Sequence, residues 1–323
     1  MTSAQLAEAS NYAVYATMVT LTIAMLAFAV SFAAGRRPST SAAVVQESYV
    51  AAGSTAVLTR VDAPAVAAPV DAGRRAANIG MSLTWLAFGL LAVGVVLRGV
   101  WAGRVPWGNM YEFSITAALG VLGVFLFASI QRDLRWLGLF VVTPTLLWLG
   151  LAVTVLYSDA AQLVPALKSY WLVIHVSAAI ISFGAFSFSA ATAAFALLRK
   201  RAERRADGAA VTGWLSRVPE SDRLDALTGR VIAFAFPIWT FAVVAGAIWA
   251  ENAWGRYWGW DPKETVSFVA WVVYAAYLHA RSTAGWRDKK AAWINVVGFV
   301  AMVFNLFFIN LVTVGLHSYA GVG

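Results

Sequence analysis

The stretch LGLFVVTPTLLWLGLAVTVLY, residues 137–157, decides the fold, because none of its 21 side chains is charged. A helix of about 20 apolar residues crosses the ~30 Å hydrocarbon core of a bilayer. Comparable apolar stretches lie on both sides of it, at residues 11–34, 77–100, 112–130, 170–198, 231–250, 262–280 and 291–314. The sequence therefore predicts an all-α fold, a polytopic integral membrane bundle of about eight transmembrane helices.

The composition agrees with a bilayer as the main solvent. Of the 323 residues, 60% are hydrophobic and 12% are charged, whereas soluble domains are about 25% charged. The chain has no cysteine, which excludes disulfides, thiolate metal sites and a cysteine nucleophile. Any reactive thiol must therefore come from another protein.

The charge pattern predicts the topology. Of the 24 Lys and Arg residues, 19 fall in four alternate connections, residues 35–78, 131–136, 199–230 and 281–290. Basic connections stay in the cytoplasm, so we expect both termini on the outer side. This alternation indicates contacts with the lipid bilayer and argues against a nucleic-acid partner.

We expect two units along the chain. Residues 1–76 contain the first transmembrane helix and a flexible cytoplasmic linker, since residues 38–73 are rich in Ala, Val and Pro and show no helical periodicity. Residues 77–323 form the main membrane domain. Within it, residues 211–229 are expected to form a short helix at the inner membrane interface.

The outer connection at residues 251–264, ENAWGRYWGWDPKE, is rich in aromatic side chains. A single Trp at this depth is typical of an aromatic belt. The cluster, with its two glycines, instead favours a surface on which a flat conjugated ligand stacks. Asp261 has two interpretations that stay open here, because Asp-Pro-Lys-Glu is also a favourable helix start.

Three histidines occur in the whole chain. His175 and His317 are expected near the outer ends of their helices. His279 lies 17 residues beyond Pro262, about 26 Å deeper in a helix. A hydrogen-bonded structural role is common for such residues, but ionisable groups in a membrane are costly and often functional. The two outer imidazoles are suited to haem iron, or to zinc if further ligands are present.

The aromatic connection resembles a known signature. Trp254-Gly255-x-x-Trp258-x-Trp260-Asp261 is similar to the WWD motif of haem-handling proteins in cytochrome c biogenesis. The stretches at residues 109–112, 165–176 and 315–319 resemble the CcsA family, a subunit of the system II cytochrome c synthase. The resemblance runs from about residue 77 to residue 319.

The resemblance implies a subunit of a haem lyase complex that exports haem b and presents it for attachment to apocytochrome c. It implies that His175 and His317 bind the iron at an outer site and that His279 binds it at a transmembrane site. A CcsB (ResB-like) membrane subunit supplies the second transmembrane ligand, and thiol-reducing proteins act on the same pathway. The membrane is then the plasma membrane or an equivalent energy-transducing membrane, with haem delivered on its outer face. The implied haem-binding loop consists of Trp254, Gly255, Trp258, Gly259, Trp260 and Asp261.

Arg256 and Lys263 are candidates for pairing with the haem propionates, since both are cations beside this loop. We identify no catalytic residue. A second interpretation is a membrane cytochrome that transfers electrons and keeps its haem. It is weakened because His279 has no second histidine at its depth in this chain. A solute transporter is a third interpretation, but no inverted repeat is detected.

Overall fold

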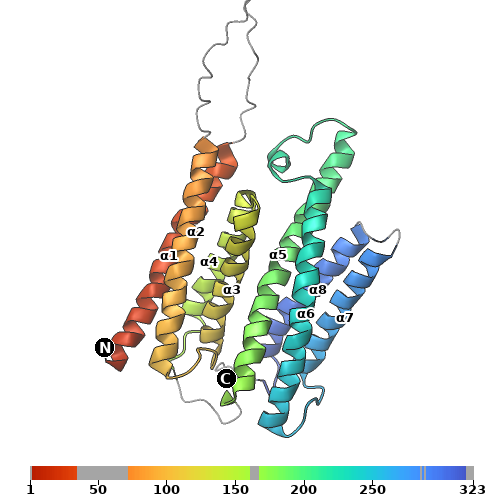
Figure 1. Ribbon diagram of the computed structural model, residues 1–323. Coiled ribbons are helices and arrows are strands. Elements are labelled where there is room, and N and C mark those ends of the chain that lie inside the picture. The colour runs from red at the N-terminus through yellow and green to blue at the C-terminus, as the bar shows by residue number, and fades with distance from the viewer. Residues whose placement is uncertain (1, 35–71, 161–166, 284–285, 287–288, 318–323) are drawn as a thin grey trace, which may run out of the picture.

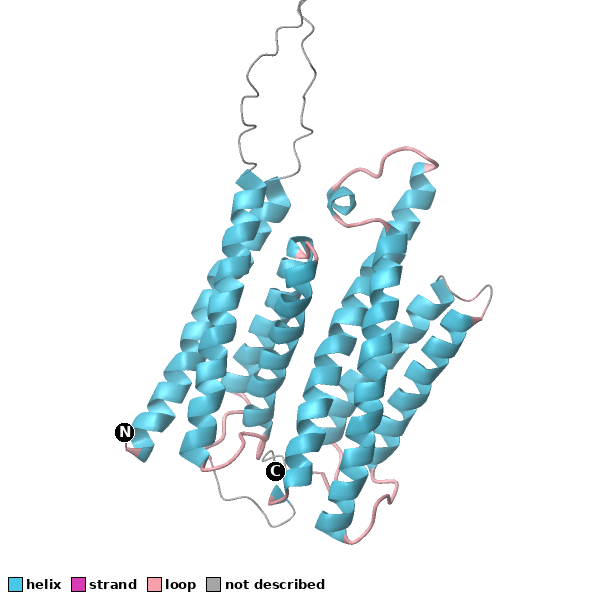
Figure 2. Cartoon of the chain, viewed as in Figure 1, coloured by secondary structure: helices cyan, strands magenta, loops and turns pink. Residues whose placement is uncertain are grey.

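The computed structural model describes residues 2–34, 72–160, 167–283, 286 and 289–317. The long helices are α1 (Ser3–Ala34), α2 (Ala72–Ala102), α3 (Met110–Gln131), α4 (Gly138–Thr154), α5 (Tyr170–Ala206), α6 (Ser221–Trp254), α7 (Pro262–Ser282) and α8 (Lys289–Leu311). Two short 3-10 helices, η1 (Arg135–Leu137) and η3 (Trp214–Arg217), lie in connections. The described residues contain no strand (Figure 2), so the predicted all-α class is confirmed. The predicted linker lies almost entirely outside the described residues.

The helices have the length and composition of membrane spans. Within the described part of the chain, seven of them are long and apolar enough to cross a bilayer. The remaining long helix, α7, has 21 residues, but Lys263, Glu264, His279 and Arg281 near its ends make it less apolar. The chain is therefore a polytopic helical bundle, as the sequence predicts.

Consecutive long helices run in alternating directions (Figure 1). The close sequential pairs are α1 with α2, α5 with α6, and α7 with α8. As a result, α1 begins and α8 ends at the same end of the bundle, together with the connections 103–109 and 255–261. We call this the site end. The opposite end carries the α5–α6 connection with η3, and we call it the basic end.

Small and polar residues bring the helices together. Gly184 of α5 faces Gly120 of α3 so closely that a Cβ at residue 184 would lie 3.1 Å from the Gly120 carbonyl oxygen. The Asn295 side chain of α8 donates to the Ser189 carbonyl of α5 at 3.0 Å. Close packing and hydrogen bonds of this kind drive helix association in lipid, where the hydrophobic effect between helices is weak.

One predicted element is wrong. Residues 211–229 do not form a separate interfacial helix, because α6 already begins at Ser221 and continues without a break to Trp254. The 3-10 turn of η3 is the only helical structure between residues 207 and 220 in this described connection. The polar first turns of α6 are paired with the C-terminal turns of α5: the Ser221 hydroxyl donates to Glu203 at 2.6 Å. This pairing extends both helices beyond their apolar segments.

Candidate functional site

The two predicted outer histidines line one pocket at the site end. His175 projects from α5 and His317 from the segment that follows α8. The pocket is walled by α3, α5, α6, α7 and α8 and includes Trp107, Trp239, Trp249 and Trp258. His279 lies elsewhere: its side chain is exposed near the end of α7 at the basic end of the bundle. The structure thus brings two of the three histidines together.

His175 is held by the neighbouring helix α6. Its Nδ1 lies 2.7 Å from the carbonyl oxygen of Ala242. A carbonyl only accepts hydrogen bonds, so Nδ1 carries the proton and the lone pair of the neutral ring is on Nε2. Gly246 makes room for this ring, because a Cβ at residue 246 would lie 2.7 Å from Nδ1.

His317 is held in the same way by a carboxylate. Its Nδ1 donates to Oδ1 of Asp261 at 2.8 Å, and the Leu316 backbone N–H donates to Oδ2 at 2.8 Å. Burial alone would raise the pKa of Asp261, but hydrogen bonds from His317, Leu316 and Lys263 hold that pKa at about 2. Burial lowers the pKa of His317, against the opposing effect of Asp261. At neutral pH the pair is therefore an ionised Asp and a neutral His that carries its proton on Nδ1.

Trp249 of α6 lies against both imidazoles, although the sequence did not single it out. It is 1% exposed. Its ring is stacked on His175 with the centroids 6.2 Å apart, and it meets His317 edge to face at 5.7 Å. Trp254 contacts both His317, at 5.0 Å, and Trp249, at 4.8 Å. Both histidines are thus fixed by a hydrogen bond at Nδ1 and by an indole ring.

The structure confirms the helix-cap interpretation of Asp261 and adds a contact that the sequence did not predict. Its side chain accepts from the Lys263 N–H, and Glu264 accepts from the Asp261 N–H, which completes a capping box at the start of α7. The same carboxylate orients His317. The helix cap therefore fixes where a candidate ligand stands.

The residues of the Trp-rich loop face different directions. Trp258 lines the pocket, whereas Trp260 is 64% exposed and has a φ of 57°. Gly255, with a φ of 70°, is the left-handed residue that ends α6. The Gly259 N–H donates to Glu264 at 2.8 Å. The loop thus presents one indole inward and another outward.

Lys263 and Arg256, the two cations expected near the haem propionates, also differ in whether they line the pocket. Lys263 lines the pocket, and its Nζ donates to Oδ1 of Asn310 at 2.6 Å. Arg256 lies against Gly259, pairs with Glu264 at 3.7 Å and is not among the pocket-lining residues. Lys263 is therefore the better placed of the two for an anionic group in the pocket.

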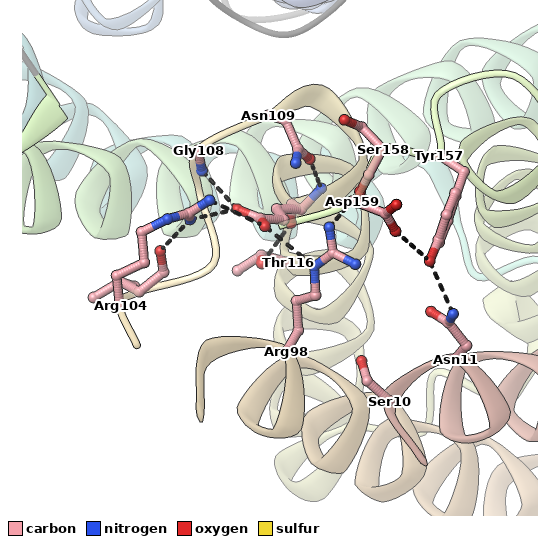
Figure 3. A network of polar contacts seen from close by, with 12 residues as sticks. Ser10, Asn11, Arg98, Arg104, Gly108, Asn109, Thr116, Tyr157, Ser158 and Asp159 are labelled. Atoms are coloured by element: carbon pink, nitrogen blue, oxygen red, sulfur yellow. Dashed lines mark hydrogen bonds and ion pairs between the residues drawn. The ribbon is translucent and has the colours of Figure 1, made fainter. Parts of the chain in front are cut away.

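A buried ionic network holds the neighbouring loop in place (Figure 3). Glu112 accepts from Arg98 at 3.1 Å, from Arg104 at 2.6 Å and from the Gly108 N–H at 2.8 Å. Arg98 and Glu112 are both fully buried, and Arg98 also donates to the Ser158 carbonyl. The network fixes residues 104–108, and Trp107 of this loop lines the pocket.

The donor set fits haem better than zinc. Among the described residues, no three His, Cys, Asp or Glu side chains are placed to hold one metal ion, whereas structural zinc usually needs four ligands and catalytic zinc three. Two neutral imidazoles that each carry their proton on Nδ1, inside a pocket walled by indole rings, are instead groups suited to haem iron and a porphyrin face.

The comparisons with known proteins agree with this class of site. Residues 107–317 match the family described as cytochrome C assembly protein. A cytochrome c biogenesis protein CcsA of Prochlorococcus marinus is 34% identical over 255 residues, 71% of this chain and 80% of the relative. The CcsA protein of Guillardia theta is also 34% identical, over 75% of this chain and 85% of its own length. The fold and site are those of multi-pass membrane proteins that act in cytochrome c maturation. This chain belongs to the cytochrome c assembly protein family.

A solved structure shares the fold. The cytochrome c heme lyase CcmF superposes with a TM-score of 0.64 at 16% sequence identity, covering 95% of this chain and 47% of that one. The chain thus spans about half the length of that protein, and at this identity the likeness is one of fold. The family match begins at Trp107, so α1 and α2 precede it, and it ends at His317.

Proposed function

We propose that this chain holds haem b between His175 and His317 and presents it on the outer face of the membrane for attachment to apocytochrome c. The observation that carries this proposal is the matched arrangement of the two histidines. Each donates through Nδ1 to a fixed acceptor, Ala242 or Asp261, and both histidines line the same pocket. Acceptors at the second nitrogen orient metal-binding imidazoles and increase their basicity.

The remaining pocket residues fit the other parts of the ligand. Trp258 and Trp107 offer flat apolar faces, and each aromatic contact contributes about 1 kcal/mol beyond burial. Lys263 supplies a cation for a propionate, with Asn310 holding its Nζ. Bound haem supplies the porphyrin that is joined to cysteine thiols, and these thiols belong to the apocytochrome because this chain has no cysteine.

His279 belongs to the proposed inner haem site. It is exposed on α7, and the chain's other histidines are at the site end. A second imidazole must therefore come from a CcsB (ResB-like) membrane subunit, while thiol-reducing proteins act on the apocytochrome. An electron-transferring cytochrome, the competing function, would hold both of its haems in the isolated chain.

The test compares His175→Ala and His317→Ala with the wild type, purified from membranes at matched abundance. Each variant should lose the low-spin bis-imidazole haem spectrum and cytochrome c maturation. His279→Ala is the matched control in the isolated chain, because its exposed side chain should leave the outer haem in place. Normal maturation in the double variant His175→Ala, His317→Ala would exclude this site as the delivery point.

A further inference from the structure

A crevice at the basic end separates the α1–α2 pair from the rest of the bundle. Phe28 and Phe32 of α1 form one wall, Trp136 of η1 forms another, and Arg74 of α2 and Arg217 of η3 lie at its rim. The crevice is on the opposite end of the bundle from the histidine pocket. It combines aromatic side chains with a largely basic lining at an end of the bundle, where membrane helices meet lipid headgroups.

The arginines outnumber the carboxylates that can neutralise them. Five arginines line the crevice: Arg74, Arg135, Arg199, Arg217 and Arg223. Three of them are paired with acids, Arg135 with Asp133 at 3.4 Å, Arg199 with Glu203 at 2.9 Å, and Arg223 with Glu220 at 3.4 Å.

Arg74 and Arg217 are the two that remain. Within the described residues, no carboxylate lies within ion-pair distance of either. The Arg217 guanidinium is instead held over the Phe32 ring, 5.2 Å from its centroid. The crevice therefore carries two excess positive charges beside an aromatic wall.

We propose that this crevice binds an anionic phospholipid, with the headgroup phosphate between Arg74 and Arg217 and an acyl chain along the partly exposed Phe32. Guanidinium groups bind phosphate oxygens in bidentate geometry and are weakly hydrated. Basic pockets between transmembrane helices are suited to anionic headgroups, which are enriched in the cytoplasmic leaflet. A headgroup with one phosphodiester carries one negative charge and a headgroup with two carries two, so either is attracted by the excess charge of the crevice.

A lipid bound in this crevice contacts both the α1–α2 pair and the rest of the bundle. The family match covers residues 107–317, so α1 and α2 lie outside it, while Trp136 and Arg217 lie within it. A lipid in the crevice bridges these two parts of the chain. It adds to direct contacts such as that of Phe28 with Gly138, where a Cβ would lie 2.3 Å from the Phe28 ring.

The experiment uses the full chain, delipidated in detergent and titrated with dioleoyl phosphatidylglycerol or dioleoyl phosphatidylcholine under native mass spectrometry. The wild type should retain one phosphatidylglycerol and discriminate against phosphatidylcholine. Arg74→Gln, Arg217→Gln should weaken phosphatidylglycerol binding roughly thirtyfold, since each arginine near an anionic lipid contributes about fivefold. Arg201→Gln, Arg204→Gln is the control, because both are exposed on the same end of α5 and neither lines the crevice.

Four results would overturn the proposal. The first is equal phosphatidylglycerol binding by the crevice variant and the control variant. The second is displacement of the lipid by equimolar inorganic phosphate, which would assign the arginines to a soluble anion. The third is loss of bound haem, measured from its absorption, in the crevice variant while lipid binding is unchanged. A wild-type chain that retains no phospholipid contradicts the proposal as well.

Discussion

The Nδ1 of His317 and the Oδ1 of Asp261 lie 2.8 Å apart, although 56 residues separate them in the chain. The same carboxylate begins α7 by accepting from the Lys263 N–H. One side chain therefore links the start of α7, the Trp-rich loop and the segment after α8. This link places a neutral imidazole at the edge of the pocket and explains why a helix cap can also determine the position of a ligand.

Asp261→Ser separates these two roles. Serine caps a helix about as well as aspartate, so α7 should remain intact, but its side chain is too short to reach His317. Loss of a partner behind a metal-binding histidine typically costs 10–100-fold in affinity. We expect haem retention to fall by about that factor, measured by titrating the purified chain and following the absorption spectrum. Wild-type affinity in this variant would show that Asp261 is only a cap.

Gly246→Ala should displace the His175 ring of α5, because Gly246 lies on the neighbouring helix α6. The added Cβ would lie 2.7 Å from Nδ1, so the ring must move and its bond to Ala242 must break. We expect weaker haem binding and a shift of the low-spin spectrum toward a single-imidazole form. Gly89→Ala is the matched control, because a Cβ there meets nothing within 4 Å. Indistinguishable spectra for the two variants would contradict this role of Gly246.

The sequence predicted the helices well because apolar length is a local property. The fourth segment was expected at residues 137–157, and α4 spans Gly138–Thr154. The separate helix predicted at residues 211–229 is wrong because a polar stretch does not necessarily end a membrane helix: α6 begins within it, at Ser221. Ser221 and Glu203 extend α6 and α5 beyond the apolar stretch by pairing with each other, and this contact between distant residues leaves no periodic pattern.

The site was predictable in its residue types and not in its geometry. His175, His317 and the Trp-rich loop stand out because histidines are few and tryptophans cluster. Trp249 does not stand out, since one Trp inside an apolar helix resembles any other lipid-facing or core residue. Its position against both imidazoles depends on how α6 packs against α5, as does the bond from His175 to Ala242, 67 residues away.

Glu112→Gln tests the buried network behind the Trp107 loop. It would leave Arg98, which is fully buried, without its carboxylate. Removing one partner of a buried pair costs about 3–5 kcal/mol, so we expect a clearly lower thermal unfolding midpoint and faster proteolysis of the loop. Glu220→Gln is the control. The Glu220 and Arg223 side chains of this ion pair are 67% and 78% exposed, so the pair contributes at most about 1 kcal/mol. Equal midpoints for the two variants would contradict a structural role of the network.

The orientation of the bundle can be measured directly because the chain has no cysteine. Lys168→Cys lies before α5 at the site end and Ser282→Cys ends α7 at the basic end, and both side chains are exposed. Since 19 of the 24 basic residues fall in the four stretches 35–78, 131–136, 199–230 and 281–290 and basic connections stay in the cytoplasm, an impermeant maleimide should label intact cells only at residue 168. Permeabilised cells should be labelled at both positions, which controls for reactivity. Labelling of intact cells at residue 282 alone would show that the bundle has the opposite orientation. The two histidines would then lie on the cytoplasmic side, where they could not deliver haem outward.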